Sequence, residues 1–273
     1  MRINKTIKGL GVSKSTVYYK SKPYPERKRT ARKERCEQMK AAIMELTAKK
    51  STYGVPRVKA LLKRDYGLNV TKYMVHRYMK EEGLLITRHR TRGSSRSPTG
   101  QIAVESPNTR WASDITSIKC SNGEKLRVAF LMNYCDRSII AWRAGKHRQA
   151  VDIELMVQED FCTRFGETLP AMEQLQFLHD NGPEFVEKNL KTSLKSWNII
   201  DCNTPTYSPQ SNGMCEALNG TFKRDYVYES CLDTSQTVIN QIQKWVDEYN
   251  RYAPHSALHM KTRNEFYNFK IAA

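Results

Sequence analysis

The stretch WASDITSIKCSNGEKLRVAFLMNYC, residues 111–135, decides the fold of the larger part of this chain. Its two halves are rich in apolar and β-branched residues, which is typical of strands. Between them, SNGE contains Asn122-Gly123, a pair that favours a tight hairpin turn. RSIIAWRAG, residues 137–145, then supplies a third strand. The sequence therefore predicts an antiparallel meander of three strands.

Beyond the meander, helices and short strands alternate along the chain. Apolar residues at helical spacing indicate the helices, and short apolar runs indicate the strands. A meander followed by such alternation predicts an α/β core in which a mixed sheet carries flanking helices. The expected elements are a helix at about 149–165, the strand LQFLHD at 175–180, a helix near 184–197, a strand around 199–200, and two closing helices at about 211–227 and 234–252.

Charge is distributed unevenly over the 273 residues, whose formal net charge is +17. Residues 1–100 hold 26 Lys and Arg against 7 Asp and Glu, whereas the remainder is close to neutral. Charge runs are often only a solvated surface. An excess this large and this localised favours a nucleic-acid-binding module joined to a different domain.

Composition also excludes some classes of protein. The longest uncharged apolar run, around Val128–Cys135, is far too short to span a bilayer. Met1 is followed by polar and basic residues, where an export signal would be apolar. The seven cysteines are scattered and form no C-x-x-C pair, which argues against a zinc site or a disulfide framework. We therefore expect a soluble, reduced, intracellular protein without a membrane partner.

The basic third contains YGVPRVKALLKRDYGLNVTKYMVHRYMKEEGLL, residues 53–85, which predicts two short helices. Pro56 suits the first turn of one helix, Gly67 permits a tight turn, and Thr71 can cap the second helix. Two short helices joined in this way fit a helix-turn-helix, although any two packed helices with solvated lysines would look similar.

The second of these helices is expected to bury Val75, Tyr78 and Met79. Its opposite side is basic and is the expected DNA-contacting surface. That side carries Lys72, Tyr73, His76, Arg77 and Lys80.

The chain then changes character at residues 87–109, which are rich in Ser, Gly, Pro and Arg and lack periodicity. If this linker touches DNA, Arg88, Arg90 and Arg92 would do so through phosphates. The expected organisation is a basic N-terminal helical segment at 1–50, a helix-turn-helix at 51–86, the linker at 87–109, and a catalytic core at 110–273.

Three carboxylates stand where chemistry is plausible. Asp114 lies inside the first strand, where aspartate is unfavourable without a task or a partner. Asp180 ends an apolar strand and precedes Asn181-Gly182, at the edge where α/β sheets place ligands. Glu216 falls early in a helix. If the two strands are neighbours and the helix crosses the sheet, the three side chains converge.

Carboxylates packed that closely repel one another unless cations lie between them. Mg²⁺ is a hard, oxygen-seeking ion that suits such a site, and two ions about 4 Å apart can activate an attacking oxygen and stabilise a leaving one. The alternative is that the three residues are unrelated, since an Asp before Asn-Gly is often only a turn former.

Five blocks of sequence resemble the retroviral-integrase-like (DDE) transposases of bacterial insertion sequences. Thirty-five residues separate Asp180 from Glu216, which is the spacing of the D,D-35-E signature of that family. The segment 53–85 is similar to the N-terminal helix-turn-helix of the same proteins. The five blocks are WASDIT at 111–116, HDNG at 179–182, SPQSNG at 208–213, Tyr249-Asn250, and PHSAL at 254–258.

The resemblance implies an RNase H-like core in which Asp114, Asp180 and Glu216 are both the catalytic residues and the ligands of Mg²⁺ or Mn²⁺, with two ions. It also implies that Lys223, seven residues after Glu216, is a basic residue next to the DNA. The implied reaction nicks an element end by hydrolysis and then lets the exposed 3′-OH attack another phosphodiester. Double-stranded DNA is the implied partner, bound by a homo-oligomer in the bacterial cytoplasm and nucleoid.

The match is closest to the downstream-frame (OrfB) product of two-frame elements, and relatives are usually made as a longer fusion. An upstream-frame (OrfA) segment is therefore an expected partner, and the chain alone is expected to be incomplete. Cys215 stands where relatives often have a small or aliphatic residue, and Ala253 replaces a residue that is commonly polar or basic. Pro183-Glu184 follows the second block, and neither this pair nor Cys215 removes a metal ligand.

Other candidates for the site have simpler interpretations. Asp136 is expected to serve a turn, and His179 is as well explained by packing or hydrogen bonding as by metal assistance. His255 is expected to be structural, and Trp245 and Tyr249 share an apolar helical stripe that indicates core.

Two alternatives to a transposase remain open. A non-catalytic DNA-binding regulator made by the same element is the first, but a pure binder has no need of three converging carboxylates. An RNase H-type nuclease is the second, and products of strand transfer would separate it from a transposase.

Overall fold

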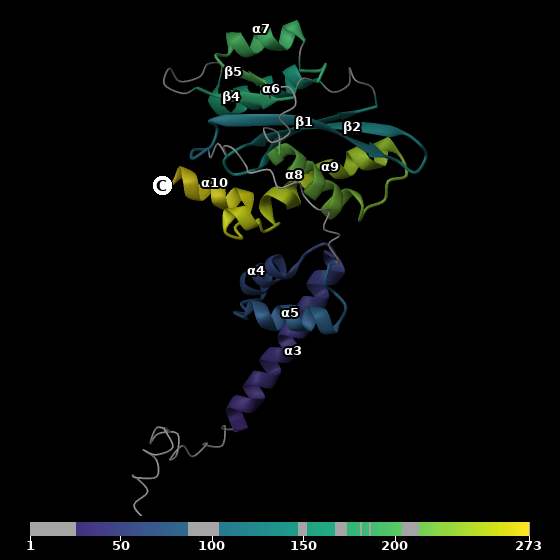
Figure 1. The fold of residues 1–273 in the computed structure, drawn as a ribbon, viewed down its shortest axis with the longest axis vertical. Coiled ribbons are helices and arrows are strands. Elements are labelled where there is room, and N and C mark those ends of the chain that lie inside the picture. Colours follow the sequence, from purple (N-terminus) through teal and green to yellow (C-terminus); the bar gives the residue numbers. More distant parts are fainter. Residues whose placement is uncertain are drawn as a thin grey trace, which may run out of the picture.

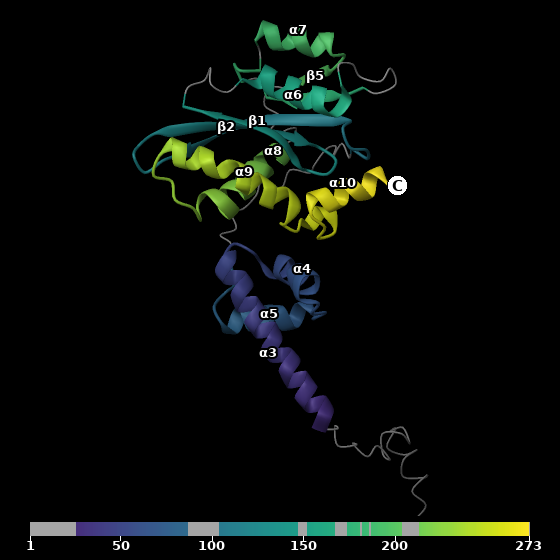
Figure 2. The same ribbon diagram turned by 180° about the vertical axis from the view of Figure 1, so that it is seen from behind.

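The computed structural model describes the backbone of residues 26–86, 104–146, 152–166, 174–180, 182–185, 187–203 and 213–272. Figure 1 and Figure 2 show these residues from opposite sides, as a sheet domain with a smaller helical module beneath it. Among the residues that the structure describes, no helix is long and apolar enough to cross a membrane.

The sheet has five strands in the order β3-β2-β1-β4-β5. The first three form the predicted antiparallel meander, whose turn carries Gly123 at a φ of +85°. The last two run parallel to β1, so the sheet is mixed, as predicted. The strands are β1 (Arg110–Lys119), β2 (Lys125–Asn133), β3 (Ile139–Gly145), β4 (Gln176–His179) and β5 (Ile200–Asn203).

Helices cover both faces of the sheet, because the strands carry apolar side chains on each face. Trp111 packs with α6 (Ile153–Phe165) and α7 (Lys188–Ser196) on one face. Its neighbour Ala112 packs on the other face, with α8 (Gly213–Phe222) and α9 (Ser235–Arg251). Both views show α6 and α7 on one side and α8, α9 and α10 on the other. Trp245 and Tyr249 lie in the second cluster, so the core interpretation of these residues is confirmed.

The C-terminal part differs from the expectation in two respects. The helix expected to reach residue 227 ends at Phe222 and continues as a π-helix, η3 (Lys223–Val227). The chain does not close with α9, because a 3₁₀ turn, η4 (Ser256–Leu258), and a further helix, α10 (Arg263–Ile271), follow it. The side chain of Thr262 and that of Glu265 form a capping box at the start of α10.

The helical module consists of α3 (Glu26–Lys49), α4 (Val55–Tyr66) and α5 (Lys72–Glu81). Its local signals are those expected: Gly67 has a φ of +64°, and the Thr71 side chain accepts from the N–H of Met74. One hydrophobic cluster joins all three helices, so α3 of the expected 1–50 segment packs with α4 and α5 of the expected 51–86 domain. Its members include Met39, Ile43, Leu46, Val58, Leu61, Leu62, Val75 and Met79.

Candidate active site

Two of the expected carboxylates stand at matching positions on neighbouring parallel strands. β1 pairs with β4, and Ala112 lies opposite Leu178 in the last paired position. Asp114 lies two residues later within β1, and Asp180 lies two residues later, directly after the last residue of β4. Side chains two residues apart in a strand point to the same face. Asp114 and Asp180 therefore emerge side by side on the face of Ala112 and Leu178, which is the face that α8 covers.

The third carboxylate comes from α8, which lies across this face. Cys215 and Leu218 of α8 are buried against the sheet, in the same cluster as Ala112. Between them in sequence lies Glu216, whose side chain is exposed. One turn later, Asn219 donates from Nδ2 to Oδ2 of Asp114 at 2.8 Å. This hydrogen bond ties the helix that carries Glu216 to the strand that carries Asp114.

The electrostatics of the site reflect this convergence. Burial raises the pKa of Asp114 to about 6, and the charges of Asp180 and Glu216 act in the same direction. Hydrogen bonds from the N–H of Ile115 and from Asn219 oppose the rise. Burial and then the same three carboxylates also raise the pKa of the Cys215 thiol. A thiol with these neighbours stays protonated and is a poor nucleophile or metal ligand.

Asp180 is held by the turn that follows it. Its Oδ1 accepts from the N–H of Gly182 at 2.9 Å. A Cβ atom at position 182 would lie 2.9 Å from the same oxygen, which is closer than real contacts allow. The glycine of the HDNG block therefore permits the close approach of the backbone to the carboxylate.

The three carboxylates do not yet form a closed ligand set. Within the described residues, no three His, Cys, Asp or Glu side chains lie close enough together to hold a metal ion as they stand. Oxygens of Asp114 and Asp180 are engaged by Asn219, Ile115 and Gly182. The side chain of Glu216 is exposed.

His179 contributes to the frame of the site. It is 1% exposed, its Nε2 lies 2.7 Å from Oδ1 of Asp201, and its Nδ1 lies 2.6 Å from the carbonyl oxygen of Asp180. Its ring also stacks on Phe185, with the centroids 4.9 Å apart. Because both ring nitrogens are engaged, packing and hydrogen bonding account for His179 without a metal.

The remaining rivals lie apart from the carboxylates. Asp136 is buried in the turn between β2 and β3, where its Oδ1 accepts from the N–H of Ser138. Burial raises its pKa. His255 is half-buried, and burial together with Arg263 and Arg137 lowers its pKa to about 3. The expected structural roles of both residues fit these surroundings.

The expected DNA-contacting residues occupy two places. Lys223 is half-buried at the start of η3. On α5, Val75, Tyr78 and Met79 are buried, and the opposite side is exposed as predicted. That exposed side consists of Lys72, Tyr73, His76, Arg77 and Lys80. Arg88, Arg90 and Arg92 of the expected linker, Asn181 of the second block and most of the third block lie outside the described residues.

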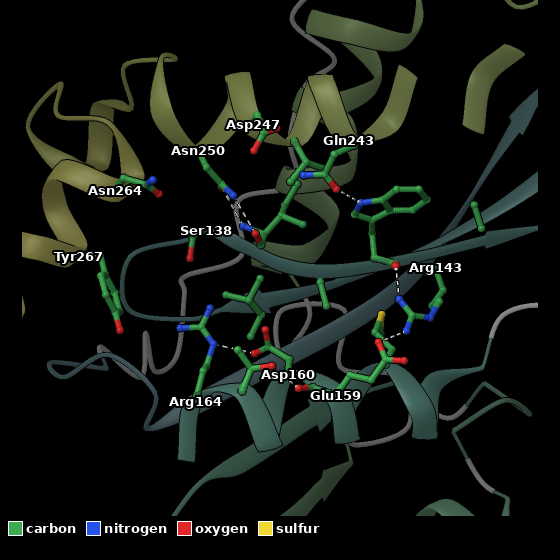
Figure 3. A pocket seen from close by; sticks show the side chains of 18 of the residues that line it. Ser138, Arg143, Glu159, Asp160, Arg164, Gln243, Asp247, Asn250, Asn264 and Tyr267 are labelled. Carbon is green, nitrogen blue, oxygen red and sulfur yellow. Dashed lines mark hydrogen bonds and ion pairs between the residues drawn. The ribbon is translucent and has the colours of Figure 1, made fainter. Parts of the chain in front are cut away.

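A large cavity of about 840 Å³ lies elsewhere, along the edge strand β3 and between α6, α9 and α10. Asp114, Asp180 and Glu216 are not among its lining residues. Figure 3 shows that polar side chains in this cavity pair with one another: Arg164 with Asp160, Arg143 with Glu159, and Gln243 with the indole of Trp142. The cavity is therefore separate from the site where the carboxylates converge.

Two residues near the carboxylates were not expected from the sequence. Asn219 stands three positions after Glu216, a spacing that places both residues on one side of a helix. This spacing could have predicted that Asn219 lies near the carboxylates. Asp201, the partner of His179, lies on β5, and no local pattern connects two residues on different strands.

Comparisons with known proteins agree with this architecture. Residues 104–209 and 201–262 each match a model described as an integrase core domain, and residues 33–92 match an HTH-like domain. An insertion element IS136 protein of Agrobacterium fabrum is 36% identical over 194 residues, which cover 70% of this chain and 99% of the relative. The transposase InsD of insertion element IS2 from Escherichia coli is 34% identical over 224 residues, covering 79% of this chain and 73% of InsD.

Among solved structures, the integrase assembly (intasome) of simian T-cell lymphotropic virus, in complex with the PP2A regulatory subunit B56 gamma, shares the fold. The TM-score is 0.51 at 19% identity, over 76% of this chain and 73% of that chain. The mixed sheet, the helical module and the extent of the sequence matches lead to one conclusion: the chain belongs to the integrase-core transposases of bacterial insertion elements.

Proposed function

We propose that this transposase cuts DNA strands at the ends of its insertion element and joins them to new sites, with Asp114, Asp180 and Glu216 as its catalytic residues. The observation that carries the proposal is the register of β1 and β4. The pairing of Ala112 with Leu178 supports Asp114 and Asp180 as neighbours on one face, under the helix that carries Glu216.

The donor set suits divalent magnesium or manganese. Three carboxylates offer hard oxygen ligands, and burial with mutual repulsion raises the pKa of Asp114 to about 6, a cost that a cation would relieve. Asp114, Asp180 and Glu216 would hold two ions once Glu216 turns inward. When bound, the ions would polarise the phosphate and stabilise charge on the attacking and leaving oxygens.

The chain's own residues orient the site. Asn219 holds Oδ2 of Asp114, and the N–H of Gly182 holds Oδ1 of Asp180. No protein nucleophile is needed, because each step forms one P–O bond and breaks another. In the first step water attacks and the 3′ oxygen leaves as a hydroxyl. In the second step that hydroxyl attacks a target phosphodiester, and the 3′ oxygen of the target strand leaves as a hydroxyl. Positioning of the reactants therefore supplies much of the rate.

Double-stranded DNA is the proposed partner, held by the exposed side of α5 and by Lys223. The side chains of Lys72, Arg77 and Lys80 are exposed cations that can contact phosphates. Arg88, Arg90 and Arg92 are proposed to add phosphate contacts. Two element ends must be held together for joining, which favours a homo-oligomer on DNA. An upstream-frame segment is a further proposed partner, and action on the chromosome places the enzyme in the bacterial cytoplasm.

The test is a cleavage and strand-transfer assay on duplexes that carry the element's own ends, with Mg²⁺. Wild type is compared with Asp180→Asn, each alone and fused to the upstream frame. Asp136→Asn is the matched control, because it removes a buried carboxylate that lies in a turn and outside the site. We expect Asp180→Asn to lose at least about a thousandfold in rate, as loss of several kcal/mol of charge stabilisation implies. The Asp136→Asn variant should still cut and join.

Three results would contradict the proposal. Specific binding without cutting, by the wild-type chain both alone and fused, would favour a non-catalytic regulator. Cutting without joined products would favour a simple nuclease. Equal rates for wild type and Asp180→Asn would remove the carboxylates from the reaction.

A further inference from the structure

The helical module meets the sheet domain through a buried ion pair. Arg57 of α4 donates from Nη1 to Oδ2 of Asp225 on η3 at 2.5 Å. The two side chains are only 16% and 1% exposed, so the pair lies inside the contact. Beside it, Nζ of Lys50 lies 2.7 Å from Oε1 of Glu248 on α9. An ion pair shielded from water in this way is screened by salt much less than an exposed one, and removal of one partner is strongly destabilising.

Further contacts fix the same orientation at the rim. Arg64 donates from Nη1 to the carbonyl oxygen of Tyr252, and the hydroxyl of Tyr252 donates to Oδ2 of Asp65. Ala253 completes the hydrophobic cluster of the helical module, although it belongs to the sheet domain in sequence. The module is therefore attached at η3 and at the end of α9, and two separated attachments resist rotation.

The ion pair is also continuous with the catalytic residues. η3 follows α8 without a break, so one helical rod carries Glu216 near its start and Asp225 near its end. Lys223, the proposed DNA contact, lies on the same π-helical turn as Asp225. π-helical turns inside α-helices are rare and occur frequently at functional sites.

α5, the helix whose exposed side is the proposed DNA contact, lies beyond α4 from the sheet domain (Figure 1, Figure 2). α5 packs against α3 and α4, and its basic side is exposed. In both views α4 lies between α5 and the sheet domain (Figure 1, Figure 2). DNA held on α5 is thus connected to Glu216 through α4, the Arg57–Asp225 pair and the rod formed by η3 and α8.

We propose that Arg57 is a positioning residue for the reaction: by pairing with Asp225 it fixes the offset between DNA bound on α5 and the carboxylates, and so sets which phosphodiester is cut. This inference deepens the proposed function and rests on it. A rigid connection defines a single offset, whereas a loosened one lets the bound end reach the carboxylates at several positions. Misplacement of reacting groups by about 1 Å can cost a hundredfold in rate.

The test maps the cleavage position on a labelled duplex that carries the element's terminal repeat, and measures the affinity for the same duplex. Arg57→Met removes the charge but keeps the length of the side chain, and Arg57→Lys keeps the charge. Arg143→Ala is the matched control, because Arg143 pairs with Glu159 within the sheet domain. Asp225 also pairs with Arg224, so Asp225→Asn is measured both alone and combined with Arg57→Met to test whether Arg57 and Asp225 act through each other.

We expect wild type, Arg57→Lys and Arg143→Ala to cut at one phosphodiester. Arg57→Met should bind within about twofold of wild type, cut at several adjacent positions, and cut about tenfold less per bound complex, as displacement of the reacting groups predicts. The double variant should cut as Asp225→Asn alone does, because position 225 carries no charge for residue 57 to pair with in either variant. The proposal is overturned if Arg57→Met cuts at the wild-type position and rate.

A second measurement tests the docking of the helical module on the sheet domain and does not depend on catalytic activity. Small-angle X-ray scattering should find a larger radius of gyration for Arg57→Met than for wild type and for Arg143→Ala. If wild type itself does not cut, the proposed function fails. If wild type and all variants also have the same radius of gyration, the proposed role of Arg57 in docking the helical module fails as well. A melting curve on each variant separates loss of docking from loss of folding.

Discussion

At the scale of single residues, Gly182 shows how closely the backbone approaches the carboxylate of Asp180, one of the three proposed catalytic residues. A Cβ atom there would meet Oδ1 of Asp180 at 2.9 Å, so Gly182→Ala should turn that carboxylate away. We expect cleavage to fall by about tenfold to a hundredfold, as small misplacements do, while the free energy of unfolding changes by about 1 kcal/mol or less. Cleavage assays and urea denaturation measure the two quantities.

Gly220 on α8 is the matched control, because a Cβ atom there meets nothing within 4 Å. Gly220→Ala should stabilise the protein by about 0.5–1 kcal/mol, since it removes backbone freedom from the unfolded chain. Its cleavage rate should stay that of wild type. Equal activity of the two glycine variants would show that the approach to Asp180 is not needed.

His255 makes the free energy of unfolding depend on pH. Burial and the nearby Arg263 and Arg137 lower its pKa from 6.5 to about 3 in the folded chain. Between these pH values His255 is protonated in the unfolded chain and neutral in the folded chain. Stability is therefore present above pH 6.5 and is lost as the pH falls toward 3. From pH 6.5 to pH 5 the loss is about 2 kcal/mol.

Denaturation of wild type and His255→Gln at pH 7 and pH 5 measures this contribution. The free energy of unfolding of the variant should change less between the two pH values. His76→Gln is the control, since His76 is exposed on α5 and should leave the pH dependence of wild type intact. An unchanged pH dependence in His255→Gln would assign the acid sensitivity to other groups.

At the scale of elements, the two sides of α5 have different expected roles, one in packing and the other in DNA binding. Its buried residues hold the helical module together, and its exposed side is available to phosphates. Arg77→Ala should weaken binding of the element's end and lower the slope of log affinity against log salt by about 1, because one phosphate contact is lost. The exposed Arg77–Glu81 pair contributes little to stability, so the fold should persist.

Fluorescence anisotropy between about 50 and 200 mM salt measures that slope. Lys63→Ala, which removes an exposed cation from α4, is the control and should retain the wild-type slope. If both variants lose the same amount, the binding follows total charge rather than the α5 surface.

Also at the scale of elements, local signals predict some features of the fold and cannot predict others. Asn122-Gly123 indicates the β1–β2 hairpin because turn chemistry is local. The π-helical turn at Lys223–Val227 has no such signal, since apolar periodicity does not distinguish it from an α-helix. α10 escapes a prediction from periodicity because Phe269 and Ile271 are exposed and leave no apolar stripe, although Thr262 and Glu265 carry a capping-box pattern.

At the scale of the whole molecule, the site depends on pairings that a single sequence does not reveal. The order of the three carboxylates along the chain could be predicted, and resemblance to a family suggested their roles. The placement of Asp114 beside Asp180 depends on the alignment of Ala112 with Leu178 across β1 and β4, which are distant in sequence. Arg57 and Asp225 lie further apart still, so no pattern within one element connects them.

The helical module and the sheet domain should unfold together, because Ala253 of one lies in the hydrophobic cluster of the other. Calorimetry of wild type should give one transition whose calorimetric and van't Hoff enthalpies agree. Ala253→Asp should split this transition, since an unpaired buried charge costs several kcal/mol at that contact. The exposed Ala257→Asp serves as control and should keep one transition. Two transitions in wild type would show that the domains are thermodynamically independent.

The parallel alignment of β1 with β4 also governs which changes of length this enzyme can survive over evolutionary time. Extra residues in the surface turn at 121–124 leave the pairing of Ala112 with Leu178 intact. A single residue gained or lost within either strand turns one aspartate to the opposite side of the sheet. We therefore expect homologues of this enzyme to differ in length more often in surface turns than inside these two strands.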